Sequence, residues 1–440
     1  MNRHLLRDLS AAAVAALLVL TAVLVGRAIE HRDGSLRVGR PPLLATWDPH
    51  VGPGTPAALV VAVAVVAYGP ALAARLPWRP LLLAVWGAGL AWTWSLALVD
   101  GWHRGIAEQL TTKSEYLPVV GRFHDIPAAL RDFSGHILID APDNWPAHVA
   151  GHPPGATLTF VLLDRVGLGG GGWAGVFCIT LGTTAAVAVL ITVRTLADES
   201  LARRAAPFLV LAPAAVWVGT SADGYFAAVA AWAVALLALA VRGHRPGWTG
   251  FASGLLFGLT VYLSYGLTLM ATLAGAVLLL GSRRPLPFAL AGFAVVPVLF
   301  TAYGFDWWEA YRLLVTRYHQ GAGGVRPYGY WVWANLACTV VIVGPATVAG
   351  LRRTGVMLVR RGRNHGPRHD LRLAVLVLAA LLALLVADLS GMSKAETERI
   401  WLPFAVWLLP ACAWLTGARG WLAGQAVLAL LVNHLLLTGW

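Results

Sequence analysis

The stretch Leu371-Arg-Leu-Ala-Val-Leu-Val-Leu-Ala-Ala-Leu-Leu-Ala-Leu-Leu-Val-Ala-Asp-Leu389 decides the fold class. It is long enough to cross a bilayer as one helix, because about 20 apolar residues span the hydrocarbon core. Similar runs recur along all 440 residues, of which 58% are hydrophobic and 12% charged. Soluble domains have about 25% charged residues. The sequence therefore predicts an all-α, polytopic transmembrane helical bundle and excludes a cytosolic globular enzyme.

Working outward from this stretch, the chain contains about 13 predicted spans. They lie near 9–29, 57–74, 81–99, 172–193, 205–220, 225–241, 249–261, 266–282, 286–303, 331–351, 371–389, 401–417 and 421–438. We interpret residues 1–80 as an N-terminal two-span addition and 81–440 as the transmembrane core.

The basic residues of the short loops set the orientation, since such loops stay in the cytoplasm. The segment 352–372, which overlaps the start of this stretch, carries seven arginines, and with the other short loops one face collects +15 of the net charge, against −3 on the other. We therefore predict a multi-pass protein of the cytoplasmic membrane, with its N-terminus in the cytoplasm and its C-terminus outside. The formal charge of +12 then reports topology and attraction to anionic lipids, not nucleic-acid binding.

Residues 155–168 are also apolar, but counting them as a span would place the seven-arginine segment outside. We predict a re-entrant piece or half-helix after His152-Pro153-Pro154. Irregular backbone at membrane depth is tolerated only where protein or a water-filled cavity covers it. This piece is therefore a candidate cavity wall.

Four outward segments hold most of the informative polar residues, and any active site is expected among them. We call them the first (30–56), second (100–154), third (304–330) and fourth (390–400) outward segments. Asp100 ends an apolar span where the second one begins. A carboxylate at the membrane boundary is suited to act as a base, because a lipid-borne substrate and a polar acceptor can meet there. The alternative is an ordinary helix-end acid facing water.

The string His148-Val-Ala-Gly-His152-Pro153-Pro154 places His152 at the mouth of the predicted half-helix. The positive end of a helix dipole favours anionic groups there. The alternatives are a structural turn, or a divalent metal site formed with Asp140 and Asp143; the metal is the minority interpretation.

The fourth outward segment packs Lys394, Glu396, Glu398 and Arg399 between two spans. A mixed cluster there is typical of phosphate recognition at a membrane surface, although a solvated turn has the same composition. Further cavity candidates are Asp223, Trp307 and Arg317. The three cysteines all lie in apolar runs and form no disulfide framework.

Together these motifs resemble the GT-C superfamily of polytopic glycosyltransferases. The resemblance rests on an acid that ends a span, a long outward loop and the string His152-Pro153-Pro154. It extends to Ala202-Arg203-Arg204 and to Glu398-Arg399-Ile-Trp401-Leu-Pro403, and covers roughly 81–415. The chain is most similar to the protein O-mannosyltransferase and lipid A aminoarabinose transferase branch. The abundance of arginine, alanine and glycine is typical of a high-GC bacterium.

The resemblance implies an inverting transferase that moves a sugar from a polyprenyl-phosphate donor to a lipid, glycan or protein acceptor at the outer face. It implies Asp100 as base, and Arg399 and Lys394, then Arg317, as donor-phosphate ligands. His152 is the second catalytic candidate. Asp140, Asp143, His148, Asp223, Trp307 and Glu398 would line the cavity.

Two features depart from the family pattern: Gly101, not a second acid, follows Asp100, and no large soluble C-terminal domain is expected. The family resemblance settles no cofactor, and a divalent metal stays open. The competing interpretation is a non-enzymatic polyprenyl-lipid or glycolipid transporter or flippase. It would need polar residues along a path through the membrane, and these are scarce.

Overall fold

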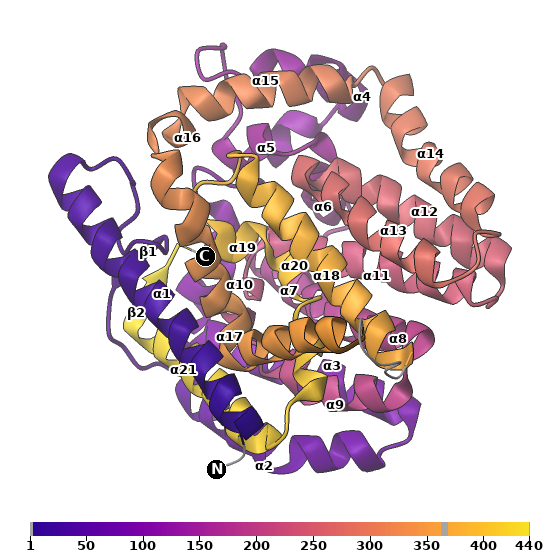
Figure 1. Ribbon diagram of the computed structural model, residues 1–440. Coiled ribbons are helices and arrows are strands. Elements are labelled where there is room, and N and C mark those ends of the chain that lie inside the picture. Colours follow the sequence, from indigo (N-terminus) through magenta and orange to yellow (C-terminus); the bar gives the residue numbers. More distant parts are fainter. Residues whose placement is uncertain (1–2, 362–367, 440) are drawn as a thin grey trace.

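A computed structural model describes residues 3–361 and 368–439, and this part of the chain is almost entirely helical (Figure 1). The α-helices and strands are α1 (Arg3–Asp33), β1 (Ala45–Trp47), α2 (Thr55–Arg75), α3 (Trp78–Ala97), α4 (Ile126–Asp132), α5 (Ala147–Gly151), α6 (Pro154–Arg165), α7 (Gly171–Gly182), α8 (Thr184–Leu196), α9 (Glu199–Val210), α10 (Ala215–Val218), α11 (Ala222–Val241), α12 (Pro246–Leu263), α13 (Ala271–Leu280), α14 (Leu286–Ala302), α15 (Trp307–Gln320), α16 (Ala322–Val325), α17 (Tyr328–Arg361), α18 (Arg368–Leu389), α19 (Thr397–Ile400), α20 (Leu402–Ala405), α21 (Ala418–Leu435) and β2 (Leu436–Thr438). Short tight helices are η1 (Leu98–Asp100), η2 (His103–Ala107), η3 (Gln109–Thr111), η4 (Leu117–Phe123), η5 (Phe133–His136), η6 (Tyr265–Met270) and η7 (Leu409–Trp414).

Long apolar helices identify the chain as a multi-pass membrane protein. Among the described residues, seven helices are long and apolar enough to cross a bilayer. The count is eight if α14 and α15 are one span, bent by 77°. In Figure 1, α15 accordingly lies across one end of the bundle while α14 runs along its side. The all-α prediction is confirmed at this level.

Predicted spans beyond these are shorter, broken or less apolar in the structure, and the count of 13 stays a prediction. The predicted span 205–220 becomes α9, a turn and α10, because Pro213 interrupts it. Likewise 401–417 divides into α20 and η7, with a proline near the start of each. Of the seven arginines of the 352–372 segment, Arg363 lies outside the described residues.

The predicted half-helix is α6, which begins at Pro154 and has 12 residues. At 1.5 Å per residue its length is about 18 Å, well short of the roughly 30 Å hydrocarbon core. The last residue, Arg165, donates hydrogen bonds to the backbone oxygens of Phe123 and His124 in the second outward segment. Both ends of α6 therefore lie against that segment.

Hydrogen bonds join the four outward segments to one another. Arg317 on α15 donates to the Ile137 oxygen at 2.6 Å, which connects the third segment to the second. Arg326 donates to the oxygens of Leu36 and Lys394, which connects the third segment to the first and fourth. Segments that are far apart in sequence therefore gather at one end of the bundle.

The predicted cytoplasmic connections are likewise joined at the other end of the long helices. Arg203 donates to the oxygen of Leu76 at 2.8 Å, and Arg372 to that of Leu196 at 3.2 Å. The indole of Trp414 donates to Asp370 at 2.9 Å. The hydrogen bonds thus agree with the predicted division of the connecting segments between two faces of the bundle. The compartment that each face meets stays a prediction.

Helix α17 consists of two helical pieces that meet at Gly344, where φ is 76°. Pro345 follows and has no backbone N–H for a helical hydrogen bond. Gln425 of α21 compensates: its Nε2 donates to the Val343 oxygen at 2.8 Å, and its Oε1 accepts from the Ala346 N–H at 3.3 Å. A buried amide side chain thus replaces the bonds that the break removes.

The N-terminal residues are integrated with the end of the chain. Strand β1 pairs antiparallel with β2, with Thr46 opposite Leu437. Helix α1 packs along α17, at the left of Figure 1. The division into a two-span addition and a core remains a prediction.

Candidate functional site

A buried ionic cluster lies where the second and fourth outward segments meet the first turn of α11. It consists of Arg399 on α19, Asp223 on α11, His148 on α5, Glu115 ahead of η4, and Glu396 directly before α19. The side chains of Arg399, Asp223 and Glu115 are at most 5% exposed. Charged side chains at such depth are tolerated only when they are paired.

Arg399 is the centre of the cluster. Its Nη1 donates to Oδ2 of Asp223, and its Nη2 lies 3.6 Å from Oε2 of Glu396. Burial would lower the pKa of Arg399, but the carboxylates of Asp223 and Glu115 outweigh this effect and raise it. The guanidinium therefore stays charged inside the protein.

His148 joins Arg399 to Glu115, and the donors fix its tautomer. Nη2 of Arg399 lies 3.3 Å from Nε2 of His148. Since a guanidinium has no acceptor, Nε2 must offer its lone pair to this contact. Nδ1 then carries the proton and faces Oε1 of Glu115 at 2.6 Å. The result is a Glu115–His148 pair whose basic nitrogen is covered by Arg399.

His152 lies beside the cluster but is held differently. Its Nδ1 is 2.7 Å from the backbone oxygen of His148 and 3.1 Å from the hydroxyl of Tyr116. A carbonyl only accepts, so Nδ1 carries the proton. Burial lowers the pKa of His152 to about 4. His152 is therefore neutral at pH 7, with Nε2 as an acceptor.

Glu396 is fixed between two arginines. Its Oε1 lies 3.3 Å from Nη1 of Arg326, whose same nitrogen donates to the Lys394 oxygen at 2.7 Å. Burial would raise the pKa of Glu396, but Arg399 and Arg326 outweigh this effect and lower it. Ala395 and Glu396 have φ values of 71° and 62°, uncommon for residues other than glycine. This turn directs Glu396 back toward Arg399.

Glu398 points to the first outward segment instead. Its Oε1 accepts from the Leu44 N–H at 2.9 Å, and the side chain is fully buried. Burial raises the pKa of Glu398 to about 7. Glu398 thus ties α19 to the N-terminal part of the chain and is a carboxyl that titrates near neutral pH.

Asp100 belongs to a second polar group, built from the first and second outward segments and helix α21. Its Oδ1 accepts from Nη2 of Arg104 at 2.5 Å and lies 3.1 Å from Nε2 of His50. Arg104 also reaches Asp48 at 3.6 Å, and the His50 ring stacks on that of His434. The structure therefore brings Asp100 together with His50 and Arg104, and gives it no direct contact with Arg399 among the described residues.

The other predicted site residues hold loops together. Nζ of Lys394 donates to the Gly323 oxygen at 2.9 Å. Arg317 donates to backbone oxygens of the second outward segment, and Asp140 accepts from Gln320 of α15 at 3.2 Å. Asp143 and Trp307 also make contacts that involve the backbone. The backbone oxygen of Asp143 accepts from Arg122, and the indole of Trp307 donates to the backbone oxygen of Val261.

Sequence reasoning missed Glu115, Tyr116 and Arg326. Glu115 lies in a stretch of mixed polar residues that carries no motif, and only the fold places it against His148. Arg326 had one signal: it is the last basic residue of the third outward segment, two positions before α17.

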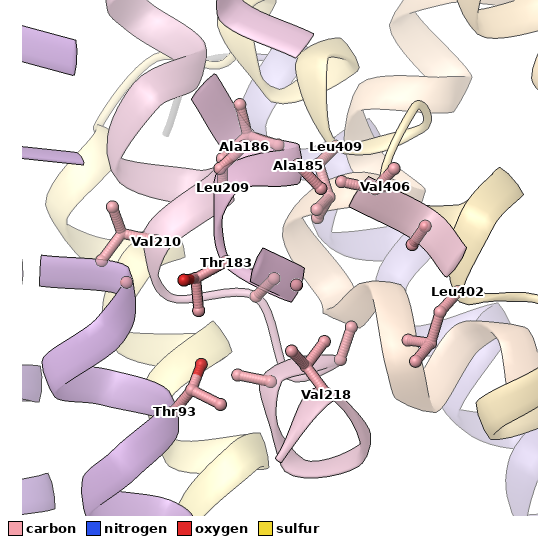
Figure 2. A pocket seen from close by; sticks show the side chains of 16 residues that line it. Thr93, Thr183, Ala185, Ala186, Leu209, Val210, Val218, Leu402, Val406 and Leu409 are labelled. Atoms are coloured by element: carbon pink, nitrogen blue, oxygen red, sulfur yellow. The ribbon is translucent and has the colours of Figure 1, made fainter. Parts of the chain in front are cut away.

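Among the described residues, no group of three or more histidine, cysteine or acidic side chains is arranged to hold a metal ion. A cavity of about 60 Å³ lies within the bundle, and Figure 2 shows its lining. The lining is aliphatic apart from the hydroxyls of Thr93 and Thr183. This cavity therefore has no charged group for a phosphate, unlike the ionic cluster.

No family model and no curated protein matches the sequence. The fold resembles two crystal structures of the Archaeoglobus fulgidus oligosaccharyltransferase. For the complex with Zn and sulfate, identity is 15% and the TM-score 0.47, covering 79% of this chain and 51% of that one. For the apo form they are 13% and 0.46, covering 77% and 50%. This chain thus spans about half the length of that enzyme, and a likeness at this level carries no argument about activity.

Proposed function

We propose that this protein is a membrane glycosyltransferase that moves a sugar from a polyprenyl-phosphate donor to an acceptor at the outer face of the cytoplasmic membrane. The observation that supports it most is the buried cluster of Arg399, Asp223, His148 and Glu115 at the loop-bearing end of the apolar helices. A cation and a base in contact, next to lipid-facing helices, are what transfer from a lipid phosphate requires.

Arg399 is the proposed ligand of the donor phosphate. A guanidinium binds phosphate through two parallel N–H···O bonds, which a lysine cannot reproduce. With His148 neutral, the two arginines Arg399 and Arg326 face the three carboxylates Asp223, Glu396 and Glu115. The cluster then carries one negative charge. A phosphate must therefore draw Arg399 from its present partners.

This exchange couples donor binding to catalysis. When Arg399 turns to the phosphate, Nε2 of His148 loses its donor and becomes a free base, oriented by Glu115 through Nδ1. His148 then takes the proton of the acceptor hydroxyl. The acceptor oxygen bonds to the anomeric carbon as the bond from that carbon to the phosphate oxygen breaks. The polyprenyl phosphate leaves with the electron pair, and Arg399 stabilises its charge.

Asp100 remains the other candidate for the base, as the sequence predicts. It is 17% exposed at the end of the third long helix and already bonds Arg104. In that alternative, His148 would only position Arg399. The acceptor would approach between the first and second outward segments.

The direct test is incubation of the purified protein with a panel of polyprenyl-phosphate sugars, measuring release of polyprenyl phosphate. We expect release with at least one donor. Arg399→Ala should abolish donor binding, and Arg399→Lys should recover part of it. Arg165→Lys is the matched control for Arg399→Lys, because Arg165 contacts the second outward segment through backbone oxygens and lies outside the cluster.

Unchanged donor affinity in a folded Arg399→Ala variant would place the phosphate site elsewhere, with Arg317 next to test. If the protein carries the lipid across vesicles and releases no polyprenyl phosphate from any donor, it is a transporter and the proposal is wrong.

A further inference from the structure

A groove of about 690 Å³ runs between α1 and α17, at the end of the bundle away from the ionic cluster. Small and apolar side chains line most of it. Two arginines, Arg7 of α1 and Arg352 of α17, lie at one end. Nothing in the proposed transferase chemistry uses this groove.

Contacts between α1 and α17 hold the two helices together near both ends of the α1 lining. At one end the hydroxyl of Tyr330 donates to the backbone oxygen of Ala22 at 2.9 Å. At the other end the buried carboxylate of Asp8 accepts from both Arg352 and Arg353, with Nε contacts of 2.9 Å each. The two helices are thus fixed around the groove, which is not a gap between loosely packed elements.

The length of the groove matches one leaflet of a bilayer. Its α1 lining runs from Arg7 to Leu18. At 1.5 Å per residue this distance is about 16 Å, close to half of the roughly 30 Å hydrocarbon core. The arginines therefore lie at headgroup depth while Val14 and Leu18 lie at the depth of an acyl chain.

The charge at the groove mouth favours an anion. Arg7, Arg352 and Arg353 face the single carboxylate of Asp8, which leaves two positive charges. Among the described residues, Arg7 makes no hydrogen bond or ion pair, and its side chain is exposed. A lipid with no net charge would leave these two positive charges uncompensated, whereas a lipid with a net negative phosphate group would compensate them in part.

We propose that the α1–α17 groove is a binding site for one anionic glycerophospholipid of the leaflet on the Arg7 side. An acyl chain fills the groove along Ala11, Val14 and Leu18. The phosphate lies between Arg7 and Arg352.

Native mass spectrometry of the full chain, titrated with dioleoyl-phosphatidylglycerol or dioleoyl-phosphatidylcholine, tests this site. We expect tighter binding of the phosphatidylglycerol. Arg7→Gln should weaken that binding about fivefold, which corresponds to about 1 kcal/mol for one basic residue near anionic lipid. Arg3→Gln is the matched control, since Arg3 lies one turn away on α1 and outside the groove lining. Ala11→Leu should weaken binding of both lipids by filling the groove.

Equal losses in Arg7→Gln and Arg3→Gln would show diffuse attraction to a basic surface and overturn the site. Equal affinity of the unmodified chain for the two lipids would do the same. Both arginine variants change exposed side chains, so the decision does not depend on whether Ala11→Leu folds.

Discussion

Arg399 shows how one buried cation can be both structural and reactive. Removing one member of a buried pair typically costs about 3–5 kcal/mol, because the partner charge is left uncompensated. Here the cation has carboxylates from α11 and from the turn before α19, and it covers the lone pair of His148. Arg399 is therefore available to an incoming phosphate only if it gives up one of these partners.

Sequence could name Arg399, His148 and Asp223 as candidates, but not their assembly. Arg399 came from a charged loop and His148 from a histidine–proline string, while Asp223 was a further cavity candidate. Glu115 gave no signal, because its role depends on a 2.6 Å contact with a residue 33 positions away, across loops and short helices. Asp100 was chosen for its place at a helix end, and the fold pairs it with Arg104 and His50.

At the residue scale, the two candidate bases predict different variants to lose activity. We expect His148→Gln to lower turnover by about 100- to 10,000-fold, the usual range for general base catalysis, while donor binding is retained. Asp100→Asn, which keeps size and hydrogen bonding, should have the smaller effect. Turnover and donor affinity are measured separately on each purified variant. Near-normal turnover in His148→Gln together with a large loss in Asp100→Asn would make Asp100 the base.

At the scale of elements, long uninterrupted helices were predicted closely and broken ones were not. The run that ends at Leu389 is a single helix, α18, because nothing in it opposes helical backbone. The predicted span near 331–351 lies within α17, yet its break at Gly344 was not foreseen. Hydropathy does not register a glycine at φ 76°, nor the distant Gln425 that satisfies the backbone there.

This break makes Gln425 a stability determinant far from the ionic cluster. Gln425→Leu would leave the Val343 oxygen and the Ala346 N–H unpaired in the protein interior. Each such loss costs about 1–3 kcal/mol, so we expect a clearly lower melting temperature in detergent. Gln109→Leu, which removes one bond from a half-buried side chain, should lower it less. An unchanged melting temperature in Gln425→Leu would mean that water replaces the side chain.

At the scale of the whole molecule, charge in short loops proved the most informative signal. It sorted the connections into two groups, and hydrogen bonds in the structure join members within each group. Arg326 connects three outward segments, and Arg203 bonds the link between α2 and α3. The packing does not determine which face of the bundle lies in the cytoplasm, because the same bundle fits a membrane in either orientation.

Cysteine labelling in intact cells determines which face lies in the cytoplasm. The native cysteines, Cys178, Cys338 and Cys412, are all buried, so background labelling should be low. Lys113 lies exposed in the second outward segment, and Arg283 lies exposed in the link between α13 and α14. A membrane-impermeant maleimide should label Lys113→Cys in intact cells and Arg283→Cys only after permeabilisation, because basic short loops stay in the cytoplasm. Labelling of both in detergent is the control for accessibility. The reverse pattern would place the ionic cluster on the cytoplasmic side, and the donor would then have to be sought in the inner leaflet.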